Sequence, residues 1–186
     1  MICIAIFGIS GVGKTWLASR LAERRGMRHV QAGELLRLAK EDVEGRATTA
    51  EELRTGAVLD NQALLLQAFR RVGASEQRHI IFDGHSIVDT DAGLVEVPVA
   101  VIEGLNPCAI VFVKGEPREI AGRRSADSSR RRPLRSTEEL AQHQALALTV
   151  CERYSAALGV PLIVVGSGDL DELDQVVTTI TTGGRI

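Results

Sequence analysis

The sequence predicts an α/β sandwich in which helices cover both faces of a five-stranded parallel sheet. Four short runs of residues are apolar almost throughout, without polar alternation, which is typical of parallel strands that are covered on both faces; residues 28–31 form a fifth, weaker candidate. Helical patterns separate these runs, and strand–helix alternation favours a parallel sheet with right-handed crossovers. The chain has 186 residues, enough for one domain with a buried core. We therefore expect a single domain over residues 1–186.

The elements follow from these patterns in chain order. The expected strands span residues 2–7, 28–31, 79–82, 109–113 and 162–165. The expected helices span residues 15–25, 33–40, 57–72, 98–103, 117–124, 137–158 and 169–180. Thr137, followed by two glutamates, suits the N-terminus of the longest helix. Ligands of such a fold bind at the carboxyl ends of the strands.

One motif lies directly after the first expected strand. Residues 8–15, Gly-Ile-Ser-Gly-Val-Gly-Lys-Thr, fit the pattern G-x-x-x-x-G-K-[ST] and precede a helix, which is the context of a phosphate-binding loop. The glycines let backbone N–H groups surround phosphate oxygens, and the helix N-terminus adds partial positive charge. A tight turn with a capping hydroxyl would leave the Gly-Lys-Thr ending unexplained. The expected ATP-binding residues are Gly8, Ser10, Gly11, Val12, Gly13, Lys14, Thr15 and Trp16, with Lys14 on the β- and γ-phosphates and Thr15 on Mg²⁺.

Composition excludes several classes of protein. The net charge of −2 gives no sign of a nucleic-acid or membrane surface, and 3% aromatic residues argue against a base-stacking platform. The apolar run at residues 2–7 is too short for a membrane span. Cys3, Cys108 and Cys151 are far apart in sequence and odd in number, and the first two fall at expected buried strands. We therefore expect free thiols in a reducing cytoplasm, with neither a membrane nor nucleic acid as the favoured partner.

Two further polar residues follow the third expected strand. Asp83 ends that strand, and an acidic residue there is what a Mg²⁺ bound to phosphates requires, although such a residue also often caps a turn. His85 follows two residues later. It is either a loop histidine bonded to backbone or a contact to the nucleotide.

Arginines mark the other candidate regions. Six of them fall within residues 123–135, which we interpret as a lid over about residues 124–136; a solvated face and a nucleic-acid contact are the alternatives. Arg37 and Arg54 each follow a turn or short helix that contains glycine, within a segment of about residues 31–72. They either hold the phosphate of a second nucleotide or pair with nearby glutamates on the surface.

These motifs, in their order and spacing, resemble nucleoside monophosphate kinases, and most closely the archaeal-type adenylate kinases among the P-loop NTPases. Residues 33–37 are similar to the segment that opens the monophosphate site, and residues 81–86 look like the archaeal Asp-x-His segment. Asn106-Pro107 matches an Asn-Pro that precedes the fourth strand in the archaeal type. The lid pattern of that type is matched by Arg123, Asp127, Arg130 and Arg132.

The resemblance implies reversible transfer of the γ-phosphoryl group of ATP to AMP, which gives two ADP. No protein base is needed, because the acceptor phosphate is already an anionic nucleophile. Mg²⁺ would lie near Thr15 and Asp83. The resemblance implies catalytic roles for Lys14, Arg123, Arg130 and Arg132, and acceptor binding by Gly33, Arg37, Arg54 and His85.

The sequence also departs from the archaeal pattern. Residues 90–98 lack the tyrosine that is common there, which leaves open a kinase for another small metabolite or nucleoside. The basic lid leaves open an adenylate-kinase-like ATPase that acts as an RNA or protein assembly factor. Archaeal-type enzymes are often trimers, so a homo-oligomer, dimer or trimer, is a further expectation.

Overall fold

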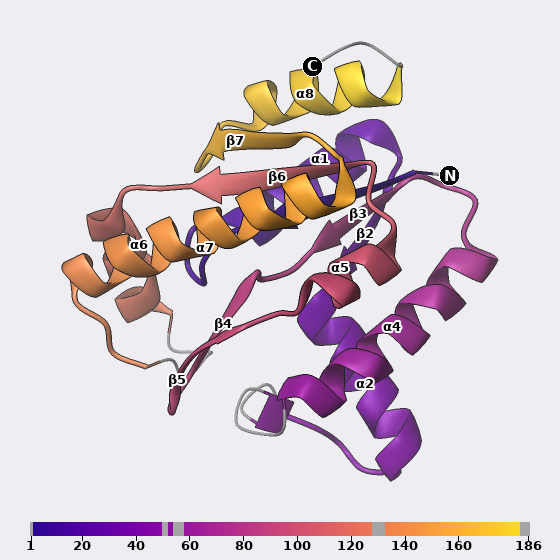
Figure 1. Ribbon diagram of the computed structural model, residues 1–186, viewed down its shortest axis with the longest axis horizontal. Helices are drawn as coiled ribbons and strands as arrows, with labels where there is room; N and C mark the ends of the chain where they lie inside the picture. The colour runs from indigo at the N-terminus through magenta and orange to yellow at the C-terminus, as the bar shows by residue number, and fades with distance from the viewer. Residues whose placement is uncertain (1, 50–51, 54–57, 128–132, 183–186) are drawn as a thin grey trace.

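A five-stranded parallel sheet forms the centre of the molecule (Figure 1). The computed structural model describes residues 2–49, 52–53, 58–127 and 133–182. The sheet has the order β2-β3-β1-β6-β7. Each strand end lies within one residue of the expected bound, so the sequence prediction is confirmed. The strands are β1 (Cys3–Phe7), β2 (Arg28–Gln31), β3 (Ile80–Asp83), β6 (Ala109–Lys114) and β7 (Leu162–Gly166).

Helices cover both faces of this sheet. α1 (Lys14–Arg25) and α8 (Leu170–Thr181) contact each other over one face, and α5 (Val99–Leu105) and α7 (Thr137–Leu158) lie over the other (Figure 1). Because both faces are covered, all five residues of β1 and all four of β3 are buried. α6 (Pro117–Ala126) lies beyond the carboxyl ends of the strands, where the phosphate loop also lies.

Two helices pair beside β2 and extend away from the sheet. These are α2 (Ala32–Glu44) and α4 (Val58–Ser75), at the lower right of Figure 1. α2 runs four residues beyond the expected end at residue 40. Ion pairs spaced four residues apart, Arg37–Glu41 and Lys40–Glu44, favour the added turn. The helix then ends at Gly45, whose φ of 67° is left-handed.

A two-stranded antiparallel hairpin was not expected from the sequence. It consists of β4 (Ile87–Thr90) and β5 (Gly93–Glu96), in a region for which the sequence predicted neither a helix nor a strand. The Tyr154 hydroxyl on α7 bonds the carbonyl of Val97, which joins the hairpin to the body of the fold. Their sequences, Ile-Val-Asp-Thr and Gly-Leu-Val-Glu, are neither apolar throughout nor strictly alternating, so no strand was expected there.

Smaller differences concern a helix cap and the cysteines. α7 begins at Thr137 as expected, and the residue before it, Ser136, is the N-cap and forms a capping box with Glu139. All three thiols are free, as expected. Cys108, however, lies one residue before β6 and is half-buried, and its N–H donates to the Cys3 carbonyl at 2.8 Å. Among the described residues, no helix is long and apolar enough to cross a membrane.

Candidate functional site

The loop between β1 and α1 has the backbone conformation that its glycines allow. Gly11 and Gly13 have φ of 88° and 97°, which are left-handed and strained for other residues. Gly13 is also the N-cap of α1, and no side chain caps this helix. The first N–H groups of α1 therefore have no side-chain acceptor at the cap, which is the arrangement that binds an anion.

A network of polar side chains lies beside this loop. Lys14 Nζ is 3.8 Å from Asp83 Oδ1, and Thr15 Oγ1 donates to Asp83 Oδ2 at 2.7 Å. Gln31 Nε2 donates to Thr15 Oγ1 at 3.3 Å, and His29 Nε2 lies 3.5 Å from Asp83 Oδ2. Burial alone would raise the pKa of Asp83, but Lys14, the nearby His29 ring and the hydrogen bond from Thr15 lower it below its usual range. Asp83 is therefore a buried carboxylate.

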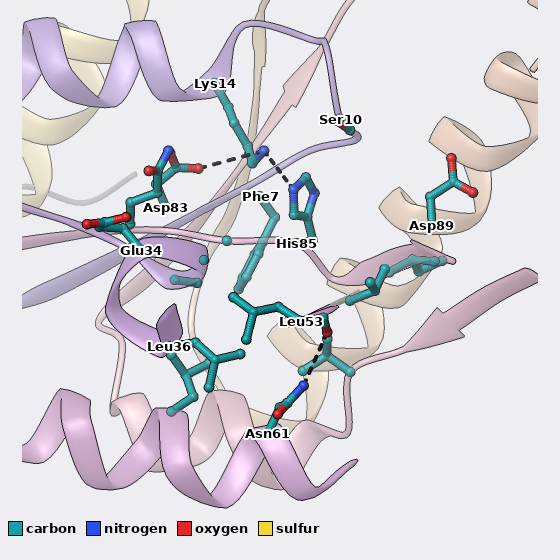
Figure 2. A pocket seen from close by; sticks show the side chains of 18 of the residues that line it. Phe7, Ser10, Lys14, Glu34, Leu36, Leu53, Asn61, Asp83, His85 and Asp89 are labelled. Atoms are coloured by element: carbon teal, nitrogen blue, oxygen red, sulfur yellow. Dashed lines mark hydrogen bonds and ion pairs between the residues drawn. The ribbon is translucent and has the colours of Figure 1, made fainter. Parts of the chain in front are cut away.

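His85 connects the loop to Lys14. Its Nδ1 lies 2.9 Å from the Gly8 carbonyl, and its Nε2 lies 3.3 Å from Lys14 Nζ. Burial and the neighbouring ammonium lower the pKa of His85, so the ring is neutral at pH 7. A neutral ring that donates from Nδ1 to the carbonyl presents Nε2 as an acceptor for Lys14. Figure 2 shows Lys14 between Asp83 and His85.

The oxygens of Asp83 and Thr15 suit Mg²⁺. This ion prefers oxygen ligands and usually takes one or two from the protein, the others from phosphates and water. Among the described residues there is no cluster of three or more histidine, cysteine or acidic side chains that could hold a metal by itself. Two convergent protein oxygens at a phosphate loop therefore fit a cation that arrives with a nucleotide.

A cavity of about 530 Å³ extends from this network under α2, α4 and the hairpin. The expected residues Ser10, Lys14, Thr15, Asp83 and His85 all line it. Away from the loop its wall is largely apolar, which suits a flat organic ring or chain. The apolar lining residues are Phe7, Leu36, Leu53, Leu65, Phe82, Ile87, Val97, Val101 and Ile102.

The residues expected to bind the acceptor fall on the α2 side of the cavity. Gly33 and Arg37 line it, while Arg54 lies outside the described residues. Arg37 donates to Glu34 and Glu41 at 2.5 to 2.9 Å. The surface ion pair that we weighed for Arg37 is therefore present, although the same side chain also reaches the cavity.

The other expected residues that the structure describes lie outside the cavity lining: Gly8, Gly11, Val12 and Gly13 of the loop, Trp16 and Arg123. Arg123 Nη1 donates to the Val12 carbonyl and to Ser167 Oγ, both at 2.9 Å, so its guanidinium lies against the outer side of the loop. Trp16 is 51% exposed. Arg130 and Arg132 are outside the described residues, and their catalytic role stays a prediction.

Residues that the sequence did not single out form a second polar cluster. Asp89 Oδ2 accepts from Arg124 Nη2 at 3.1 Å, and Asp89 Oδ1 accepts from Arg135 Nη2 at 2.9 Å. Arg124 and His143 line the cavity together with Asp89. The arginine run pointed to the region of Arg124, but nothing in the sequence separated it from its neighbours. Asp89 lies at the opposite end of the cavity from Asp83 (Figure 2).

Sequence relatives identify the family. The chain matches the family described as AAA domain over residues 7–141. It is 32% identical over 180 residues to an adenylate kinase of Methanopyrus kandleri, covering 94% of this chain and 93% of the relative. It is 33% identical over 157 residues to an adenylate kinase of Thermococcus kodakarensis, covering 82% and 79% of the two chains.

The chain belongs to the adenylate kinase family of P-loop kinases. Solved structures support the fold assignment alone. A shikimate kinase from Acinetobacter baumannii, in complex with shikimate, has a TM-score of 0.63 at 17% identity, covering 98% of this chain and 94% of that one. A sugar kinase from Janibacter sp. HTCC2649 has a TM-score of 0.56 at 18% identity, covering 98% and 95%.

Proposed function

We propose that this protein transfers the γ-phosphoryl group of ATP to AMP in the presence of Mg²⁺, which gives two ADP. The proposal rests mainly on the sequence, about a third of which is identical to adenylate kinases over most of the chain. It rests also on the phosphate loop, where Lys14 and Thr15 both contact Asp83. A cavity leads from this loop to an apolar wall, which supports an acceptor with a base.

The chain's own residues act by positioning and charge neutralisation. The loop N–H groups and Lys14 bind the β- and γ-phosphates, while His85 holds the Lys14 ammonium at the edge of the cavity. Gly33 and Arg37, with Arg54, bind the acceptor. Arg123, Arg130 and Arg132 neutralise charge on the transferring group. The acceptor phosphate attacks without a protein base, because it is already an anion.

Thr15 and Asp83 would hold Mg²⁺, which supplies charge neutralisation on the phosphate oxygens when bound. Asp83 keeps its negative charge for this role because its pKa is lowered. Gln31 orients the Thr15 hydroxyl by donating to its oxygen.

The segments keep their expected roles in this proposal. The segment from about residue 31 to about residue 72 binds the monophosphate, and the segment from about residue 124 to about residue 136 is the lid of a single domain. A cytoplasmic location and a homo-oligomer stay predictions.

The test is incubation of the protein with ATP and Mg²⁺ and each of AMP, GMP, CMP, UMP and dTMP, with products separated by ion-exchange chromatography. We expect ADP to accumulate with AMP and with none of the others. Conversion of a different monophosphate would reassign the acceptor and keep the mechanism. Turnover with none of them would contradict the proposal and favour a metabolite kinase or an ATPase that acts on RNA or protein.

A further inference from the structure

The two oxygens of Asp83 have different partners. Oδ1 lies 3.8 Å from the Lys14 ammonium, while Oδ2 accepts from the Thr15 hydroxyl at 2.7 Å. His29 Nε2 approaches the same Oδ2 to 3.5 Å. One oxygen of the carboxylate is therefore near the group that binds phosphates, and the other lies beside a hydroxyl and an imidazole.

His29 reaches Asp83 from β2, the edge strand that pairs with β3. In the parallel register His29 is opposite Ile81, and Gln31 is opposite Asp83. Residues two apart on a strand point to the same face, so His29 and Gln31 share one. Gln31 donates to Thr15, and His29 approaches Asp83. One face of β2 therefore supplies a neighbour to each of the two residues that we expect to hold Mg²⁺.

The imidazole of His29 is buried at its Nε2 end. The side chain as a whole is 21% exposed and lines a surface pocket beside α1, together with Ser19 and Glu23. Nε2, by contrast, is buried and makes no hydrogen bond with the described residues. Its 3.5 Å separation from Asp83 Oδ2 exceeds the usual N–H···O distance of about 2.7–3.2 Å. A small shift of the ring would turn this approach into a hydrogen bond.

A role in filling space does not explain a nitrogen at this position. An apolar side chain could occupy the gap between β2 and α1 without leaving a buried polar atom unbonded, which is costly. Nε2 carries a proton in one neutral form of the ring and in the charged form, and Asp83 is a carboxylate that can accept it. The placement of Nε2 therefore points to a role that involves Asp83.

Nucleotide binding changes the contacts of Asp83 unequally. In the proposed function Lys14 binds the β- and γ-phosphates, which makes Oδ1 of Asp83 available to the cation. The Thr15 oxygen can ligate Mg²⁺ through a lone pair and still donate its proton to Oδ2. His29 lies outside the phosphate loop and is not among the residues that line the cavity. Its approach to Oδ2 is therefore independent of the nucleotide.

We propose that His29 is a positioning residue of the magnesium site, and that its Nε2 holds Asp83 Oδ2 so that Oδ1 faces the cation that arrives with ATP. The proposal rests on the proposed function for the identity of the cation and the nucleotide. Removing the donor that orients a ligating side chain typically lowers metal affinity or activity by about 10- to 100-fold. The effect of His29 passes through Asp83, which makes it separable from a general loss of structure.

The test is calorimetric titration of the wild type, His29→Leu and His29→Gln with β,γ-imido-ATP, once with Mg²⁺ and once with EDTA. For His29→Leu we expect about a tenfold loss of affinity with Mg²⁺ and less than about a twofold loss with EDTA, where no cation needs Asp83. Glutamine keeps an N–H donor of similar reach, so His29→Gln should stay within about twofold of the wild type in both series.

The matched control is His79→Leu. His79 precedes β3 at the end opposite Asp83, is exposed, and accepts from the Ile2 N–H through Nδ1 at 3.3 Å. This variant should bind β,γ-imido-ATP as the wild type does. If His29→Leu does not fold by urea unfolding, His29→Val takes its place, because a β-branched residue suits a strand.

Three results of these titrations would overturn the role of His29. They are unchanged affinity in the apolar variant, an equal loss with Mg²⁺ and with EDTA, and an equal loss in His29→Gln and His29→Leu. The first would remove His29 from the site. The other two would show that the ring supports the fold and that its N–H does not matter.

The path through Asp83 is tested by His29→Leu in the wild-type and Asp83→Asn backgrounds. A positioning residue acts only through its partner, so with Mg²⁺ we expect about a tenfold loss in the first background and less than about twofold in the second. An equal loss in both would overturn the positioning role. These titrations contain no AMP, so a protein that binds the analogue but fails to phosphorylate AMP would refute the proposed function and leave His29 to be judged separately.

Discussion

The two ends of the cavity satisfy their polar groups in different ways. Around Lys14 the side chains bond one another: Asp83 has an ammonium and a hydroxyl, and His85 has a carbonyl and the same ammonium. Around Asp89, Arg124 Nη1 and both nitrogens of His143 have no partner among the described residues.

This difference separates an end where Lys14, Asp83 and His85 contact one another from an end where several buried nitrogens lack partners, although His29 Nε2 beside Asp83 is also unbonded. The Lys14 end keeps its geometry through its own contacts, which suits a group that must be aligned before the nucleotide arrives. The Asp89 end bears the energetic cost of buried nitrogens that are not hydrogen-bonded. Variants at the two ends should therefore fail in different ways.

The largest effect is expected for Lys14→Ala. Removal of the ammonium takes away the contact to the β- and γ-phosphates, so kcat/KM for phosphoryl transfer should fall by about a thousandfold. Asp83 also loses its buried partner, which should lower stability by roughly 3 kcal/mol. Steady-state kinetics and urea unfolding measure the two effects. Activity within tenfold of the wild type would show that Lys14 does not contact the reacting phosphates.

A smaller loss, about a hundredfold in kcat, is expected for Asp83→Asn. The amide keeps the shape but removes the negative charge that the buried site maintains. The Mg²⁺ concentration for half-maximal rate should rise at the same time. Asp171→Asn, at an exposed ion pair with Arg24, serves as the control and should leave the Mg²⁺ dependence unchanged. An unaltered Mg²⁺ dependence in Asp83→Asn would remove the carboxylate from the metal site.

Gly11→Ala tests the connection between the two ends. The Cβ of the alanine would lie 2.7 Å from Arg124 Cγ, which is too close. The alanine would also have to keep the left-handed φ of Gly11. We expect about a tenfold weaker nucleotide binding and a loss of roughly 1–2 kcal/mol in the free energy of unfolding. Gly26→Ala shares a left-handed φ of 62° but has nothing within 4 Å, so it should lose stability and keep nucleotide affinity. Equal affinity in the two variants would show that the Arg124 stem does not matter.

The smallest effect concerns pH and His143→Gln. Burial lowers the pKa of His143. Asp89 raises it, while Arg124 and Arg135 lower it further. Below pH 6.5 the unfolded chain therefore binds a proton at this residue that the folded chain does not. This part of the stability is present above the unfolded pKa of 6.5 and is lost as the pH falls. Urea unfolding at pH 7.5 and pH 5.5 should therefore show a smaller loss in His143→Gln than in the wild type. The same loss in both proteins would mean that His143 is protonated when folded.

The sequence predicted the Lys14 end far better than the Asp89 end. The glycine loop and Asp83 are read from local patterns, because a strand, a turn and a helix N-terminus fix their positions. Asp89, Arg124 and His143 come from a short hairpin, the end of one helix and the middle of another. These three residues lie close together only because of how those elements pack, and the spacing of residues along the sequence does not predict that packing. Gln31 was missed for the same reason, since its partner Thr15 lies on a different element.

The most direct measurement follows the γ-phosphoryl group itself. The protein is mixed with [γ-³²P]ATP, Mg²⁺ and AMP, and the products are separated during the first turnovers. The account predicts that the label moves to ADP at the rate at which AMP is consumed, with little inorganic phosphate. Label that appears as inorganic phosphate at a rate independent of AMP would contradict it, because the protein would then hydrolyse ATP without transferring the group to a nucleotide.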